Sequence, residues 1–166
     1  MERLDRGTLD FGVLVQPVDI SKYDALPLSY KDVWGVVMPI NHPLAVKKGI
    51  VPQDLDGIPL LFSRQVLQYV ATENPCLQWL GKSVSELNIA ATYNLIYNAA
   101  LLVRAGVGCA VTLDHLVPVG KKSGLTFRPF VPRLESAWDI VWKKGQFFSP
   151  ASSAFLSQLQ KRLGIE

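Results

Sequence analysis

The chain has 166 residues, 49% of them hydrophobic, and a formal net charge of +3. This length and composition exclude a disordered chain and predict a globular protein of one domain or two small lobes. Lysine pairs are scattered along the sequence, which does not indicate a nucleic-acid-binding surface. Cys76 and Cys109 are far apart and support neither a disulfide nor a metal site, so Cys109 is expected to be a buried free thiol. Because no apolar run is long enough to span a membrane and residues 1–10 are charged, the expected compartment is the cytoplasm.

Apolar runs separated by turn-forming residues predict four strands in the first 63 residues, over 8–15, 23–29, 32–39 and 58–63. Residues 40–57 are rich in proline and glycine, so we expect mostly loop there, with one helical turn at 52–55. Ser63 is predicted to cap a helix that starts at Arg64, and Asn74 with Pro75 ends that helix and begins another. The apolar positions of these two helices are Val66, Tyr69 and Val70 in the first and Leu77 and Leu80 in the second.

The second half of the chain continues to alternate between strand and helix patterns. Strands are predicted over 86–92, 107–113, 125–132 and 138–144, and a helix with Asn94 as its N-cap over 94–105. A last helix starts at Ser149-Pro150, ends at Gly164 and is predicted to bury Phe155, Leu156, Leu159 and Leu163. This alternation predicts an α/β fold with a mixed or parallel sheet.

Gly106 and Gly108 stand two residues apart beside an apolar run, as the glycines of a dinucleotide-binding loop do. Such a loop needs a strand before its glycines and a helix after them, and here the predicted helix comes first. Gly106 is therefore predicted to end a helix in a left-handed conformation, and the following residues to form a short buried strand. The pattern argues against nucleotide binding at this loop.

The stronger catalytic and metal-binding signatures are absent from the sequence, which weakens an enzymatic interpretation. His42 and His115 form no local pair of ligands, so a structural or surface role is expected for each. Ser63 has no motif that would activate it as a nucleophile, and its position fits a helix cap. We expect no cofactor and no metal.

Two strand-to-helix turns carry residues suited to a small anion. Ser63, Arg64 and Gln65 follow one strand, and Thr92, Tyr93 and Asn94 follow another. If both strands belong to one parallel sheet, their turns meet at the same crevice, where a cation and helix-end amides favour negative charge. The alternative is that both turns are ordinary helix caps with an exposed arginine.

The segments "LDRGTLDFGVL", "YDALPLSYKDVWGVVMPINHPLA", "PQDLDGIPLL", "LLVRAGVGCAVTL" and "LTFRPF" resemble, in order and spacing, the effector-binding domain of LysR-type transcriptional regulators. The resemblance covers nearly the whole chain. It implies a type 2 periplasmic-binding-protein fold, in which two α/β lobes bind a small effector between them. On this chain, lobe I would comprise residues 1–58 and 134–166, and lobe II residues 59–133.

The resemblance also implies which residues contact the effector. They lie in three turns and are Val15, Gln16 and Pro17, then Ser63, Arg64 and Gln65, then Thr92, Tyr93 and Asn94. Val15 is apolar where many relatives have a small polar residue, and Leu113 replaces a common proline. Arg64 favours a carboxylate or another small anion as effector.

Relative to the family pattern, the sequence begins after the first strands of lobe I and contains no winged helix-turn-helix, so we expect a ligand sensor without its own DNA-binding module. An incomplete lobe I would leave an open sheet edge, which predicts self-association into a homo-oligomer through that lobe. The alternatives are a solute-binding protein of the same fold, an enzyme built on a similar two-lobed fold, and a non-functional or assembly-only fragment.

Overall fold

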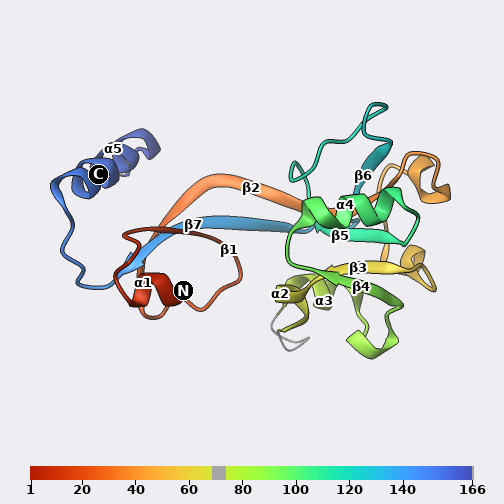
Figure 1. Ribbon diagram of the computed structural model, residues 1–166, viewed down its shortest axis with the longest axis horizontal. Coiled ribbons are helices and arrows are strands. Elements are labelled where there is room, and N and C mark those ends of the chain that lie inside the picture. The colour runs from red at the N-terminus through yellow and green to blue at the C-terminus, as the bar shows by residue number, and fades with distance from the viewer. Residues whose placement is uncertain (69–73, 166) are drawn as a thin grey trace. The chain divides into compact units, whose positions relative to one another are not determined.

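The computed structural model describes residues 1–68 and 74–165 and divides the chain into two compact units (Figure 1). Unit 1 contains Met1–Lys31 and Ser136–Glu166, and unit 2 contains Asp32–Glu135. The chain passes from unit 1 to unit 2 within strand β2 (Tyr23–Pro39) and returns at the start of β7 (Glu135–Lys143). Tyr69 and Val70, predicted as apolar helix positions, lie outside the described residues.

Unit 1 is built from both ends of the sequence. It contains α1 (Glu2–Asp5), β1 (Gly12–Val15), the first half of β2, most of β7 and α5 (Pro150–Leu163). β1 runs antiparallel to β7, with Gly12 opposite Val141. Beside this pair, Leu4, Tyr23 and Val141 form a small buried cluster. β1 is shorter than the predicted strand 8–15, because residues 8–11 form no regular strand.

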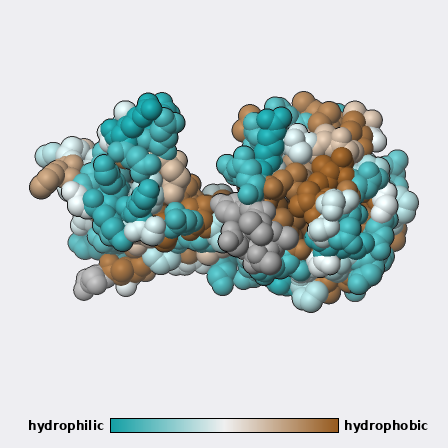
Figure 2. All heavy atoms as spheres, turned by 90° about the horizontal axis from the view of Figure 1, so that it is seen from below, coloured by the Kyte–Doolittle hydropathy of each residue, from teal (hydrophilic) through white to brown (hydrophobic). Residues whose placement is uncertain are grey.

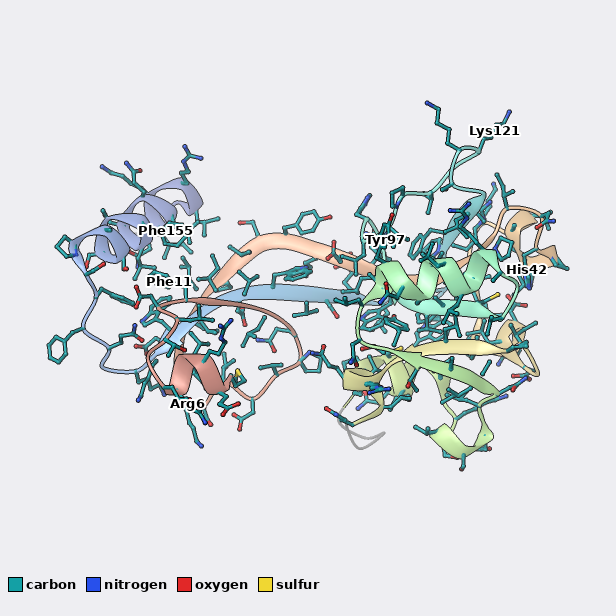
Figure 3. All side chains as sticks on the ribbon, viewed as in Figure 1. Arg6, Phe11, His42, Tyr97, Lys121 and Phe155 are labelled. Atoms are coloured by element: carbon teal, nitrogen blue, oxygen red, sulfur yellow. The ribbon has the colours of Figure 1, made fainter. Side chains whose placement is uncertain are left out.

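The last helix of unit 1 has the predicted ends. Ser149 Oγ accepts a hydrogen bond from the Ser152 backbone N–H at 3.2 Å, and Gly164 ends the helix in the left-handed region with φ of 67°. The prediction of a buried apolar face was too strong, since α5 has no buried residue and Phe155 is 50% exposed. Phe155 packs instead against Phe11, at a ring centroid distance of 5.2 Å (Figure 3).

Unit 2 is a mixed sheet with helices, which confirms the predicted fold class. β5 (Cys109–Leu113) and β4 (Ile89–Tyr93) lie parallel to β3 (Leu60–Ser63) on either side of it. The second half of β2 runs antiparallel to β5 on one side and to β6 (Leu125–Pro129) on the other. The helical elements are η1 (Pro43–Val46), η2 (Pro52–Leu55), α2 (Arg64–Leu67), α3 (Pro75–Leu80), η3 (Val84–Glu86) and α4 (Ile96–Arg104).

The core of unit 2 lies between α4 and the sheet. Val103 of α4 is fully buried against Val37, Leu61 and Ala110, which come from three neighbouring strands. α4 therefore buries one face, as its spacing of apolar residues predicts. Other apolar residues of unit 2 remain at the surface, and Figure 2 shows hydrophobic side chains gathered on the face of unit 2 seen there.

The strands predicted over 23–29 and 32–39 form one continuous strand, β2, of 17 residues. Pro27 lies within this strand and does not end it, although proline fixes φ and lacks an N–H. The predicted lobe boundary also differs, because the structure places residues 32–58 in unit 2. They belong there since β2 pairs with β5 and β6, and Ile50 bridges to Phe130.

Candidate functional site

The turn between β3 and α2 has the predicted cap. Ser63 Oγ accepts a hydrogen bond from the Gln65 backbone N–H at 3.3 Å, which fixes the start of α2. α2 is only four residues long, so its macrodipole is small. The side chains of Arg64 and Gln65 are exposed. The charge at this turn therefore comes from the Arg64 guanidinium rather than from the helix end.

The structure brings the second turn next to the first. β3 and β4 are parallel neighbours, and Ser63 lies opposite Tyr93 in their register. Arg64 Nε donates a hydrogen bond to Thr92 Oγ1 at 3.3 Å, which links the two turns directly. The convergence predicted from two parallel strands is present within unit 2.

The start of α4 differs from the prediction. Its N-cap is Leu95 rather than Asn94, and no side chain caps it. Asn94 is exposed and precedes the helix by two residues. α4 thus begins with backbone N–H groups that no side chain satisfies, at the residues immediately after the turn that Arg64 contacts. Sequence reasoning missed this feature because asparagine is the stronger capping residue of the two.

Tyr93 faces the interior of unit 2. Its hydroxyl donates a hydrogen bond to the Val111 carbonyl at 2.7 Å, and its ring packs against the core cluster. Burial is the main cause that raises the pKa of Tyr93 to about 12. The side chain of Tyr93 therefore supports the turn, while Thr92 and Asn94 on either side of it are exposed.

No described residue compensates the charge of Arg64. Among residues 1–68 and 74–165, no carboxylate forms an ion pair with Arg64, and the neutral hydroxyl of Thr92 is the acceptor of its Nε. An exposed guanidinium with open donors binds carboxylate and phosphate groups well. The turn therefore combines an exposed cation, two hydroxyls and an uncapped helix start.

The third predicted turn, after β1, lies in unit 1. The Gln16 backbone N–H donates to the Ala137 carbonyl at 2.9 Å, and its side-chain amide donates to the Asp139 carboxylate. Gln16 Oε1 accepts in turn from the Val18 N–H at 2.9 Å, so both ends of the amide are engaged. Val15 is paired with Trp138 across β1 and β7. The adjoining Pro17 is half-buried.

His42 and the two cysteines have structural surroundings. His42 Nδ1 accepts from the Leu44 N–H at 3.2 Å, and its Nε2 lies 3.6 Å from Cys109 Sγ. Both Cys76 and Cys109 are buried free thiols, which confirms the prediction for Cys109. Burial raises the pKa of Cys109 to about 11 and that of Cys76 further still. Among the described residues, no three histidine, cysteine or acidic side chains gather as a metal site.

The two glycines after α4 have the roles predicted for them. Gly106 follows the helix with φ of 79°, a left-handed conformation that glycine adopts without strain. Gly108 lies close to the chain before β3, because an added Cβ would be 2.4 Å from the Pro59 carbonyl oxygen. The order is helix, turn and buried strand, the reverse of a dinucleotide-binding loop.

Comparisons with known proteins agree with this architecture. Residues 1–164 match the family model described as the LysR substrate binding domain. The curated Hca operon transcriptional activator HcaR of Escherichia coli is 33% identical over 165 residues, which cover 98% of this chain and 54% of HcaR. The chain thus spans about half the length of this curated relative.

Solved structures show the same fold. The regulatory domain of Synechocystis CcmR, solved in complex with 2-PG, gives a TM-score of 0.76 at 17% identity, covering 98% of this chain and 77% of that one. The C-terminal domain of a probable LysR family regulator from Rhodococcus sp. gives a TM-score of 0.76 at 20% identity. The match covers 96% of this chain and 78% of that domain. None of the described helices has the length and apolar content needed to span a bilayer. Together with the family match, these findings show that the chain belongs to the LysR substrate-binding domain family, whose regulatory domains have a type 2 periplasmic-binding-protein-like fold.

Proposed function

We propose that this chain is the effector-sensing part of a LysR-type transcriptional regulator and that its effector carries a carboxylate or another small anionic group. The observation that carries the proposal is Arg64, whose guanidinium is exposed, has no carboxylate partner among the described residues and lies beside the uncapped start of α4. A cation and open backbone N–H groups both favour an anion.

Ser63, Gln65, Thr92 and Asn94 complete the proposed anion-binding turn, which we define as residues 63–65 with 92–97. The backbone N–H groups of Ile96 and Tyr97 would meet an anion directly, since the first N–H groups of a helix have no partner within it. Tyr93 would position this turn from beneath rather than contact the effector. For Val15, Gln16 and Pro17 of unit 1, a role in effector binding stays a prediction from the family resemblance, and within unit 1 the Gln16 amide is held by Asp139.

Two related proteins support a regulatory role. The curated relative is a transcriptional activator, and the structural relative CcmR was solved with a small molecule bound to its regulatory domain. We infer by analogy that this chain senses a metabolite in the cytoplasm and that the transcriptional readout belongs to the whole regulator. We assign it no catalytic role, because the proposed anion-binding turn contains neither a carboxylate nor a histidine.

A thermal-shift series tests the anion site. The melting temperature of the wild-type chain is followed with acetate, benzoate, succinate and inorganic phosphate, because an anion that binds only the folded state stabilises it by about 2.7 kcal/mol at a hundredfold excess over its Kd. The variants are Arg64→Ala and, as a matched control, Arg104→Ala, another exposed arginine of unit 2. We expect stabilisation of the wild type and the control but not of Arg64→Ala; equal shifts in all three would refute the site.

We also propose that the chain forms homo-oligomers through unit 1. Among the described strands, β1 pairs with β7 alone, so its other edge is open, and Val13 on this strand is 56% exposed. An open edge with an exposed apolar residue favours pairing with a second chain. Light scattering should show an oligomer at micromolar concentration that Val13→Lys dissociates, and a monodisperse wild-type monomer would contradict the proposal.

A further inference from the structure

Unit 2 contains a hollow that shares no residue with the proposed anion-binding turn. It has a volume of about 460 Å³ and is lined by residues 113–119, by Val37 of β2 and by Phe127 of β6. The segment that forms most of its wall connects β5 to β6 and carries Lys121 farther along, where the side chain extends away from the unit (Figure 3). A volume of this size is typical of a small-molecule pocket.

Seven of the nine residues that line this hollow are apolar. Among them, Val37 and Val117 are buried, and Leu116 and Val119 remain 41% and 52% exposed. Apolar side chains that are this exposed around a concave surface lose contact with water when a ligand fills it. The hollow therefore suits a molecule with an apolar body, in contrast to the cationic turn at Arg64.

Two polar residues at the hollow define the polar group that such a molecule would carry. Asp114 Oδ1 accepts from the Val33 N–H at 2.9 Å, and Asp114 Oδ2 lies 3.3 Å from His115 Nε2. The His115 side chain is 74% exposed, so its ring nitrogens are open to a hydrogen bond with a ligand hydroxyl. No described residue donates to His115 Nδ1. A ligand hydroxyl would be its donor, whereas a ligand carboxylate would be repelled by Asp114.

His115 is held at this hollow by an unusual backbone conformation. It is the one non-glycine residue among those described whose φ is positive, at 59°. His115 lies in a turn, where positive φ is most common, and histidine adopts this region more often than most residues with a side chain. Here the conformation presents the imidazole at the hollow beside Asp114.

We propose that this hollow is a second ligand site, for an uncharged aromatic alcohol of about one or two rings. The proposal is independent of the anion site, since the two sites share no residue and prefer ligands of opposite character. A second copy of the chain could cover the same apolar surface, and the test below separates that outcome from ligand binding.

In the test, the whole chain is titrated at pH 7 with 2-naphthol and, separately, with 2-naphthoate. Binding is measured by calorimetry and by ligand-observed NMR. Val119→Trp fills the hollow, and Val46→Trp is the matched control because Val46 is an exposed valine of unit 2 outside the lining. We expect saturable binding of 2-naphthol that Val119→Trp weakens by about tenfold or more and that Val46→Trp leaves unchanged.

Two further variants keep the proposal open to refutation even if Val119→Trp fails to fold. His115→Phe retains a ring but removes the acceptor, so it should weaken 2-naphthol binding several-fold, and Arg64→Ala should leave it intact. The proposal is overturned if no saturable binding occurs, if 2-naphthoate binds as tightly as 2-naphthol, or if binding requires Arg64. It is also overturned if binding disappears as the chain self-associates, because a second copy would then occupy the hollow.

Discussion

Arg64 and Thr92 join two turns that are 28 residues apart in the sequence, through a hydrogen bond of 3.3 Å between Nε and Oγ1. The bond holds the guanidinium at the turn that leads into α4 without neutralising it. Thr92→Val keeps the shape of the side chain and removes the acceptor. We expect this variant to weaken stabilisation by the anions of the thermal-shift series several-fold, because the loss of one such hydrogen bond costs about 1 kcal/mol. Unchanged anion binding would mean that Thr92 does not orient Arg64.

Asn74 is a buried helix cap, whereas Asn94 only resembles one. Asn74 Oδ1 accepts from the backbone N–H groups of Cys76 and Leu77, and the side chain is 3% exposed. Asn74→Ala should lower the free energy of unfolding by about 1 to 2 kcal/mol. Asn94→Ala should change it by less than about 0.5 kcal/mol, because Asn94 is exposed and caps nothing. Denaturant titrations of both variants measure this difference directly.

The hydroxyl of Tyr93 is expected to stabilise the fold rather than bind effector. Tyr93→Phe leaves the ring in the core and removes the donor to the Val111 carbonyl. The expected cost is about 1 kcal/mol of unfolding free energy. An anion that stabilises the wild type should stabilise this variant equally. A selective loss of anion binding in Tyr93→Phe would instead place the hydroxyl in contact with the ligand.

The protein should lose stability at alkaline pH. Burial raises the pKa of the Cys109 thiol to about 11 and that of the Tyr93 phenol to about 12, from 9.0 and 10.0 respectively, and it also raises the pKa of Cys76. The folded state therefore favours the protonated forms of these groups. Their contribution to the free energy of unfolding is complete below about pH 9 and declines as the pH rises toward 11. We expect a loss on the order of 2 kcal/mol between pH 8.5 and 10.5.

Cys109→Ala provides the control for this pH dependence, because it removes one of the three groups and should flatten the decline. A thiol reagent at pH 8 gives an independent measurement. Both cysteines are buried and protonated at that pH, so they should react only after unfolding. Rapid reaction of either thiol in the folded protein would contradict its assigned burial.

Gly106 and Gly108 should respond differently to alanine. Gly106→Ala places a side chain in a left-handed conformation with open space around it, at a cost of about 1 kcal/mol. Gly108→Ala should cost about 2 kcal/mol or more, because its Cβ would overlap the Pro59 carbonyl that accepts from the Cys109 N–H. Thermal unfolding of the two variants, compared under the same conditions, checks this order.

The sequence was most informative where local rules act alone. Ser149 and Gly164 mark the ends of α5, and the apolar run after Gly108 forms a fully buried strand, as predicted. It was less informative where distant pairing decides, as in β2, whose partners β5 and β6 both lie in the second half of the chain. The burial of Phe155 was overestimated for the same reason, since its depth depends on how much of the rest of unit 1 covers it.

In the candidate site, too, some features could be predicted from the sequence and others could not. Two parallel strands were enough to predict that the turns at Ser63 and Thr92 meet. The sequence could not tell which of Thr92 and Tyr93 faces outward, because neighbouring residues of a strand point to opposite sides and either assignment fits the pattern. The hollow beside His115 has no sequence signature, since residues from β2, β6 and an irregular segment surround it.

The composition of unit 1 from two distant segments imposes an order on folding during protein synthesis. Unit 2 is a continuous stretch, Asp32–Glu135, so it can fold as soon as those residues have left the ribosome. The first 31 residues must wait for β7 and α5 to emerge before they have their partners. During that interval β1 and the first half of β2 are exposed to other nascent chains, and a substitution that slows translation after residue 135 would prolong that exposure.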